Sequence, residues 1–217
     1  MVSTDEGGYG TPETRRRILE AAWGLIEERG AEVRVADVAA RAGVSRQAVY
    51  LHFGDRTGLL VALVAHMDAT IGIEQLLAPV FEAPTGVDAL ERLVAALATA
   101  APSIDAVALV LETGQYQDVA LATAFRDRMA RRQATHGMVV QRLAAEGRLA
   151  QGWTIEAATD LCYAVTMPAL WRELTQELDW TEQQYLQHVT RLLRDSLVTD
   201  AGTSTASSRP HEPTASE

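Results

Sequence analysis

The stretch VADVAARAGVSRQAVYLHF, residues 35–53, decides the fold of the N-terminal part of this chain. Its residues predict two short helices, over 35–42 and 45–53, with room between them for only a tight turn. Gly43 can adopt the left-handed conformation that ends a helix, and Ser45 can cap the helix that follows. Apolar residues at helical spacing can hold the two helices together, namely Val38, Ala42, Val44 and Val49. This is the pattern of a helix-turn-helix, whose second helix lies in the DNA major groove.

The second of these helices has a face suited to reading bases. If its apolar residues face the core, Arg46, Gln47 and Tyr50 must project outward. Arginine can bond bidentately to guanine, glutamine to adenine, and tyrosine can contact a thymine methyl group or a phosphate. Ser45 and the helix N-terminus would then meet a backbone phosphate. The sequence therefore predicts a DNA-binding surface on this helix.

Further phosphate contacts are expected on both sides of the motif. His52 and Arg56 stand where the next backbone contact would fall. A helix predicted from Thr11 to Gly30 carries three arginines, residues 15–17, in its first turns, where the helix dipole disfavours each positive charge by ~0.3–1 kcal/mol. Because this cost has no structural benefit in the sequence, it indicates that the arginines serve a function. Arg16 is accordingly predicted to contact phosphate.

The charge distribution permits this interpretation although the net charge is −10 at pH 7. Residues 11–66 hold eight arginines and seven acids, whereas residues 67–217 hold eleven arginines and twenty acids. The acidity therefore belongs to the C-terminal two-thirds, and the N-terminal third can meet phosphate if its arginines share one face. Taken alone, however, the local pattern also fits ordinary packing of a helical hairpin.

The rest of the sequence predicts helices and no strand, so the expected fold class is all-α, with a three-helix DNA-binding domain followed by a helical bundle. Further helices are expected at 57 to the upper seventies, 87–100, 103–113, 117–146, 154–178 and 181–198. Pro168 should kink its helix, and Thr181 with Gln184 should form a capping box. Residues 1–10 and 201–217 are small and polar, and are expected to be disordered tails.

The cysteine content and the lack of an apolar leader or membrane-spanning run bear on disulfide formation and on cellular location. The single cysteine, Cys162, excludes an internal disulfide and fits a small core residue. The acidic, glycine-rich N-terminus does not resemble a signal peptide, and the most apolar run, residues 59–65, is too short to cross a membrane. A soluble cytoplasmic protein without membrane contact is expected.

The order of these features resembles the N-terminal domain of TetR-family (tetracycline-repressor-like) transcriptional regulators. The resemblance rests on the arginine-rich first helix, then VADVAARAGVSRQAVYLHFGDRTGLL, then a long amphipathic helix, and it covers about residues 12–65. It implies a homodimer that binds a near-palindromic operator, most commonly as a repressor, and is released by a small-molecule effector. Arg56 falls where the family usually has a phosphate-contacting lysine.

Two positions depart from the family pattern. Arg34 stands where the family commonly has a Thr or Ser, which caps the second helix and contacts phosphate; an arginine can reach phosphate but cannot cap, so fraying is expected there. Gly58 stands where an acidic residue is more usual, and should weaken its helix by ~1 kcal/mol.

The resemblance divides the chain into a DNA-binding domain, residues 11–56, and an effector-binding and dimerisation domain, residues 57–200. Apolar stripes and two histidines of the second domain supply candidate effector contacts, although a plain core fits each of them as well: His66, Met67, Ile71, Leu109, Tyr116, Met129, His136 and Trp171. The last two helices supply candidate dimer contacts: Leu161, Val165, Leu174, Val189, Leu192 and Leu197.

Two other functions fit the sequence less well. An enzyme or carrier built on a helical bundle would need di-iron Glu-x-x-His pairs, a phosphate loop or a nucleophile motif, and the sequence contains none of these. We therefore expect no catalytic residue, no metal and no cofactor. A regulator that has lost DNA binding is the second alternative, and the intact SRQAVYLHF argues against it, since nothing else requires Arg46 and Gln47 to be exposed together.

Overall fold

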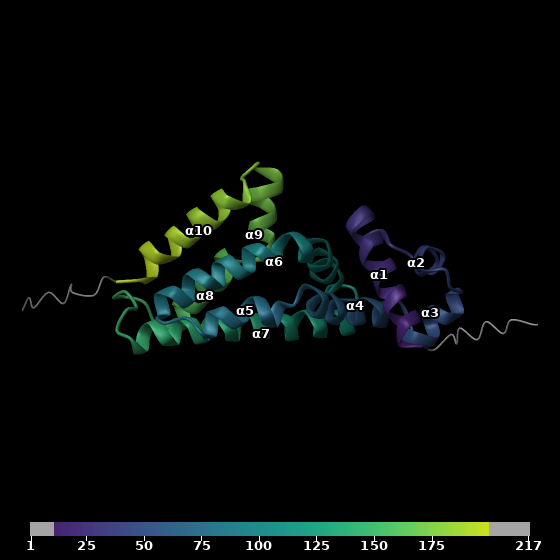
Figure 1. Ribbon diagram of the computed structural model, residues 1–217, viewed down its shortest axis with the longest axis horizontal. Coiled ribbons are helices and arrows are strands. Elements are labelled where there is room, and N and C mark those ends of the chain that lie inside the picture. Colours follow the sequence, from purple (N-terminus) through teal and green to yellow (C-terminus); the bar gives the residue numbers. More distant parts are fainter. Residues whose placement is uncertain (1–10, 200–217) are drawn as a thin grey trace, which may run out of the picture.

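The computed structural model describes residues 11–199, and in this range the chain folds entirely into helices joined by short turns (Figure 1). The one pairing of extended backbone in the described range is an isolated bridge between Leu149 and Val198. The predicted all-α class is therefore confirmed. The two expected tails, 1–10 and 201–217, fall outside the described residues.

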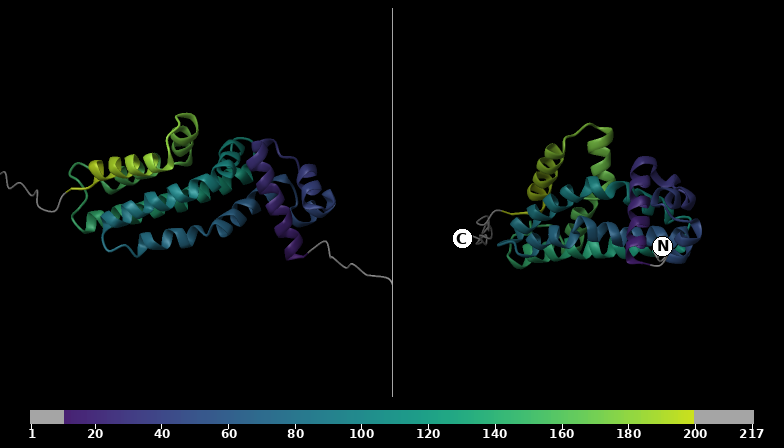
Figure 2. Two further views of the ribbon diagram at one scale, coloured as in Figure 1. Left: turned by 45° about the horizontal axis from the view of Figure 1, so that its top comes forward. Right: turned by 45° about the vertical axis from the view of Figure 1, so that its right-hand side comes forward.

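A small N-terminal head consists of α1 (Pro12–Arg29), the short turn η1 (Gly30–Glu32), α2 (Val35–Ala42) and α3 (Arg46–Phe53). It lies at one end of an elongated helical body in every view (Figures 1 and 2). The local signals act as predicted: Thr11 caps α1, and Gly43 ends α2 in the left-handed conformation with φ 65° and ψ 38°. The turn between α2 and α3 is thus fixed by residues within the motif itself.

The predicted long helix from residue 57 to the upper seventies is wrong in one respect. It is divided at Gly72 into α4 (Arg56–Ile71) and α5 (Ile73–Phe81). Gly72 adopts φ 70° and ψ 45°, a left-handed conformation that ends α4 and that only glycine reaches without strain.

The central pair of helices is longer than predicted. The segments expected at 87–100 and 103–113 form one helix, α6 (Gly86–Gly114), because Pro102 is accommodated on an exposed position inside it. α7 (Val119–Ala145) runs back beside α6. By length and hydropathy α6 could cross a membrane, but more than half of its apolar window is buried among other helices, as in the core helix of a soluble protein.

The C-terminal helices lie on one side of this pair (Figure 2). The expected helix 154–178 is interrupted, and gives α8 (Ile155–Val165), α9 (Pro168–Arg172) and η2 (Glu173–Glu177), one turn of π-helix. Pro168 has no N–H to continue α8 and instead begins α9, so the predicted kink is a full break. α10 (Glu182–Leu197) follows, with the predicted capping box of Thr181 and Gln184 in place.

Two hydrophobic cores hold the molecule together. The first joins the head to the body, because buried residues of α1 to α4 pack with the C-terminal half of α6 and with Leu121 of α7. The second lies in the body, among α5, α6, α7, α8 and α10. Leu63 and Met67 of α4 are fully buried in the first core, so α4 contributes to both the head and the body.

Candidate DNA-binding surface and effector cavity

The outer face of α3 carries the side chains that the sequence predicted to be exposed. Ala48 and Val49 are buried against the head, which turns Arg46, Gln47 and Tyr50 outward. Tyr50 is 48% exposed, and its neighbour Leu51, which the sequence did not single out, is 71% exposed. An apolar side chain on such a face can contact a thymine methyl group, so Leu51 belongs with the other three.

Four of the predicted DNA contacts lie around one surface groove of the head. Arg34 at the start of α2, Arg46 and Tyr50 of α3, and Arg56 at the start of α4 all line it. Arg56 is positioned by its Nε, which donates a hydrogen bond to the carbonyl oxygen of Val33 at 3.3 Å. The fold therefore gathers on one surface three arginines that are separated by up to 22 positions along the chain.

Ser45 and His52 have more restricted surroundings. The hydroxyl of Ser45 accepts a hydrogen bond from the Ala48 N–H at 3.1 Å, which caps α3 as predicted and leaves its own proton free to donate to a phosphate. His52 is half-buried, its ring lies 5.9 Å from that of Phe53, and its Nε2 is enclosed without a hydrogen-bond partner among the described residues. In this conformation His52 packs against the head.

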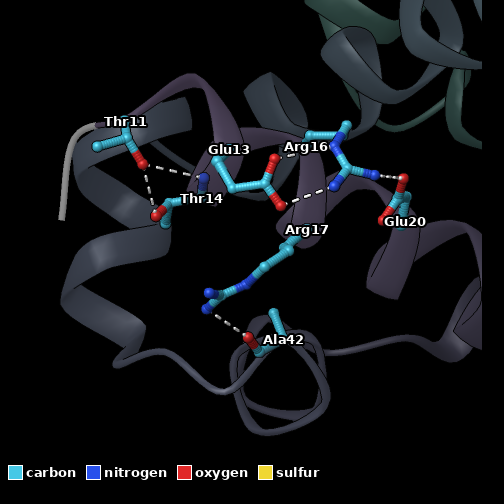
Figure 3. A network of polar contacts seen from close by, with 7 residues as sticks. All are labelled: Thr11, Glu13, Thr14, Arg16, Arg17, Glu20 and Ala42. Atoms are coloured by element: carbon cyan, nitrogen blue, oxygen red, sulfur yellow. Dashed lines mark hydrogen bonds and ion pairs between the residues drawn. The ribbon is translucent and has the colours of Figure 1, made fainter. Parts of the chain in front are cut away.

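The three arginines at the start of α1 have structural partners, so they do not bear an uncompensated cost as predicted. Figure 3 shows those of Arg16 and Arg17. Arg16 pairs with Glu13 at 2.6 Å and with Glu20 at 2.5 Å on its own helix, and these acids raise its pKa. Arg17 donates to the carbonyl of Ala42 at 3.0 Å, at the end of α2. Arg15 lies over the Phe53 ring, 5.1 Å from its centroid. Glu13 and Glu20, one turn away from Arg16, and the Ala42 carbonyl therefore offset the unfavourable interaction of Arg16 and Arg17 with the helix dipole.

The junction of α3 and α4 explains Gly58. A Cβ atom added there would lie 2.0 Å from the carbonyl oxygen of Phe53, much closer than van der Waals contact. The Gly58 N–H also donates a hydrogen bond to the Asp55 side chain at 2.7 Å, which caps α4. Gly58 therefore permits a close approach between helices, which its helix propensity alone did not reveal. At the start of α2, the Arg34 side chain makes no cap, as predicted, while its carbonyl oxygen accepts from the N–H groups of Asp37 and Val38.

The body encloses a cavity of about 330 Å³ between α4, α5, α6, α7 and the break before α9. Most of its wall is apolar: Ile73, Leu77, Leu93, Leu97, Ile104, Ala108, Leu111, Phe125, Met129, Met167 and Pro168. Its polar groups are Asp68, Glu74, Glu112, Arg128, Arg131, Arg132, Thr135 and His136. An apolar cavity of this size with a few convergent polar groups is typical of a small-molecule site.

One polar cluster in the wall connects α7 to the end of α8. Arg132 Nη2 donates to the carbonyl and, at 2.9 Å, to the hydroxyl of Thr166. His136 Nε2 lies 2.8 Å from the same hydroxyl, and its Nδ1 lies 2.7 Å from the carbonyl of Arg132. Since a carbonyl only accepts, Nδ1 carries the proton. The one proton of the Thr166 hydroxyl is shared between two acceptors at 2.8 Å, His136 Nε2 and the carbonyl oxygen of Cys162. Burial first, and the Arg132 charge second, lower the pKa of His136 to about 4, which keeps the ring neutral.

A second pair connects the cavity to α4. Arg128 Nη1 donates to both carboxylate oxygens of Asp68, at 2.6 and 2.5 Å. Asp68 lies one turn before Gly72, and Ile73 and Glu74 just after Gly72 also line the cavity. At the other end of α4, the Thr57 hydroxyl donates to Asp118 at 2.7 Å. α4 is thus tied to α7 at two places, at Arg128 in the cavity wall and at Asp118, which caps α7.

Residues 18–63 match the family profile described as "Bacterial regulatory proteins, tetR family". The match spans α1 through α3 and half of α4, the elements that build the groove described above. The N-terminal domain of this chain is therefore similar to that of TetR-family regulators.

A curated relative supports the same assignment. HTH-type transcriptional regulator TtgR of Pseudomonas putida is 42% identical over 59 residues, which are 27% of this chain and 28% of TtgR. The match thus spans little more than a quarter of that relative's length, and it carries no information on the body.

Solved structures extend the likeness to the whole TetR-type fold. A putative transcriptional regulator from Saccharomonospora viridis in complex with choline aligns with a TM-score of 0.77 at 21% identity, over 88% of this chain and 100% of that one. FadR from Bacillus subtilis in complex with stearoyl-CoA aligns with a TM-score of 0.67 at 17% identity, over 83% and 97% of the two chains. At these identities the likeness shows the fold alone.

Of the eight residues that the sequence offered as effector contacts, Met129 and His136 line the cavity of this TetR-type body. Met67 and Ile71 instead pack in the core that joins head and body, and His66 and Trp171 also lie outside the cavity wall. Leu109 is half-buried elsewhere on α6. Tyr116 is 84% exposed on the turn between α6 and α7. Helical periodicity predicted that these residues face inward, but it could not distinguish a face that lines a cavity from one that packs in the core.

The six candidate dimer residues fall into two groups. Val189 and Leu197 of α10 are 3% and 0% exposed within one subunit, so they belong to its own core. Leu192 is 50% exposed, and Leu161, Val165 and Leu174 are partly buried. Of the three predicted residues on α10, only Leu192 lies on its exposed edge.

Sequence reasoning missed Asp68 and Arg132, which line the cavity, and Thr166, which accepts hydrogen bonds from Arg132. The signal that could have found one of them is the spacing of Arg132 and His136, four residues apart on one face of α7. In the range 11–199, no three His, Cys, Asp or Glu side chains come together in a group able to hold a metal ion.

Proposed function

We propose that this protein is a transcriptional regulator, most commonly a repressor in its family, that reads operator DNA through α3 and responds to a small molecule bound in the body. The observation that carries the proposal is the outer face of α3. Arg46, Gln47 and Tyr50 are exposed there, while Ala48 and Val49 on the opposite face are buried. Two of the exposed side chains share a groove with Arg34 and Arg56, which supply phosphate contacts. No catalytic role is assigned, and the protein would act in the cytoplasm.

A homodimer is part of the proposal because one head offers a single short reading helix. Two heads related by a two-fold axis would enter successive major grooves of a near-palindromic operator. The exposed edge of α10 around Leu192, together with the partly buried Leu161 and Val165 of α8, supports a four-helix interface. Leu192→Glu should give a monomer in sedimentation analysis, while Tyr116→Glu, an equally apolar-to-acidic change at a distant exposed site, should remain dimeric.

The cavity supplies the response. Its wall includes residues on both sides of Gly72, where α4 ends, and α4 begins shortly after the last residue of α3. A ligand in the cavity therefore contacts the helix that carries the reading head. By shifting α4 it would change the spacing of the two heads and so weaken DNA binding. The ligand-bound proteins of the same fold support a ligand in the body.

The test is fluorescence anisotropy with labelled DNA from upstream of the gene for this protein, compared with a scrambled duplex. Wild type should prefer its own upstream DNA, and Tyr50→Ala should lose that preference while Tyr116→Ala keeps it. Equal binding of both duplexes by wild type, confirmed by a random-sequence selection that returns no consensus, would exclude a sequence-reading head.

A further inference from the structure

One buried cation in the cavity wall, Arg132, lacks a counter-charge within the described part of the chain. Arg132 is held by Thr166 through Nη2, yet among residues 11–199 no carboxylate pairs with its guanidinium. Its Nε is buried without a hydrogen-bond partner in the same range. Burial lowers the pKa of Arg132 to about 10, so the group is still charged at neutral pH. A buried, charged donor without an acceptor is costly, and each such group in a native structure calls for a partner.

The acids nearby are engaged elsewhere. Both oxygens of Asp68 accept from Arg128. Asp105, deep in the body, pairs with Arg172 at 2.8 Å, and the charge of Glu112 also acts on Arg172. Glu74 stands exposed at the edge of the cavity, as does Arg131. None of these acids neutralises Arg132.

The remainder of the cavity excludes most anions. Its wall is apolar along Leu93, Leu97, Ile104 and Phe125, so a ligand must bury hydrocarbon there. A phosphate group carries about −1.5 to −2 charges at neutral pH, more than one guanidinium offsets. A carboxylate carries one charge and two oxygens, which suit the fork of an arginine.

We propose that the effector is an apolar molecule with a single carboxylate, which binds Arg132 while its hydrocarbon part fills the cavity. This rests on the proposed role of the cavity as the effector site. Thr166 is the positioning residue, because its carbonyl and hydroxyl oxygens accept from Nη2 and so fix that edge of the guanidinium. The break before Pro168 ends α8 and leaves that carbonyl free to accept.

The experiment measures binding of three probes that share one hydrocarbon chain: decanoate, decan-1-ol and decylammonium. Isothermal titration calorimetry on the full-length protein at a pH of about 7.5 gives the dissociation constants. Wild type should bind decanoate about tenfold or more tightly than decanol, as a charge-assisted hydrogen bond predicts. It should bind decylammonium more weakly than either.

Two variants locate the preference. Arg132→Met should bind decanoate and decanol alike, and Arg131→Met, an adjacent arginine at the exposed edge, should keep the wild-type preference. Replacing a buried unpaired cation with methionine should not lower the melting temperature, which circular dichroism checks. If Arg132→Met does not fold, the ranking of the three probes on wild type decides alone.

Three results would overturn the proposal: no decanoate binding up to its solubility limit, decanol or decylammonium binding as tightly as decanoate, or the same loss in Arg131→Met as in Arg132→Met. The measurement does not involve DNA. A head that fails to read DNA therefore leaves the ligand preference intact, and a failed preference leaves DNA reading intact, so the two proposals fail separately.

Discussion

The reading head and the effector cavity are built in opposite ways. The residues of the DNA-binding groove lie between positions 32 and 56, on short helices whose ends are set by adjacent caps and glycines. The cavity draws on residues from 68 to 168, on five helices that meet only in the folded body. Local signals can specify the first arrangement, whereas the second depends on long-range packing. The two sites also differ in exposure: the charges of the groove lie on the surface, whereas Arg132 of the cavity is buried.

Salt should distinguish the two sites most strongly. Exposed arginines that meet phosphate release counterions, so operator affinity should fall by at least about tenfold between ~50 and ~200 mM salt. Arg132 is screened much less inside the body, so decanoate affinity should change little over the same range. Anisotropy and calorimetry at matched salt concentrations measure both. A flat salt dependence of DNA binding would show that phosphate contacts are not central to the head.

Arg46→Ala tests whether the exposed face of α3 reads sequence. The change should weaken operator binding by about 1–3 kcal/mol and relax sequence preference, because a bidentate contact to guanine is lost. Arg126→Ala, an exposed arginine on α7, is the matched control and should leave affinity unchanged. Equal losses on operator and random DNA would instead assign Arg46 to phosphate.

The buried histidine of the cavity should make the stability of the body depend on pH. The pKa of His136 is about 4 in the folded protein against an ordinary value of 6.5, so the unfolded chain binds the proton first. The resulting stability is fully present above pH 6.5 and is lost as the pH falls toward 4. At a pH of about 5 the loss relative to about 7.5 should reach about 2 kcal/mol.

Denaturant melts at the two pH values measure this loss. His136→Gln should reduce it, since a glutamine does not titrate and can both donate and accept in the same position. His188→Gln, a change at an exposed histidine of α10, serves as the control and should retain the full dependence. If both variants behave alike, the pH dependence arises elsewhere.

The smallest expected effect concerns the junction of head and body. Gly58→Ala should destabilise the protein by about 1 kcal/mol, because the clash with the Phe53 carbonyl exceeds the gain in helix propensity. At Gly137 in α7 an added Cβ meets nothing closer than 3.8 Å, so Gly137→Ala should instead stabilise by up to about 1 kcal/mol. A stabilising Gly58→Ala would show that the close approach is not maintained in solution.

The sequence by itself determined the head. The caps at Thr11 and Ser45, the left-handed Gly43 and the outward Arg46, Gln47 and Tyr50 all follow from residues within a few positions of one another. Helix ends and helix faces depend on neighbours in the chain, so a pattern there is sufficient. The capping box at Thr181 belongs to the same class.

Only the tertiary structure decided the rest. The partners of Arg15, Arg16 and Arg17, the close approach at Gly58 and the choice between core and cavity for Met67 and Met129 depend on what other helices bring near. Arg132 shows the reason most clearly. Its position on α7 follows from the sequence, but its burial without a counter-charge from residues 11–199 exists only once α8 ends beside it and the acids of the body have paired elsewhere.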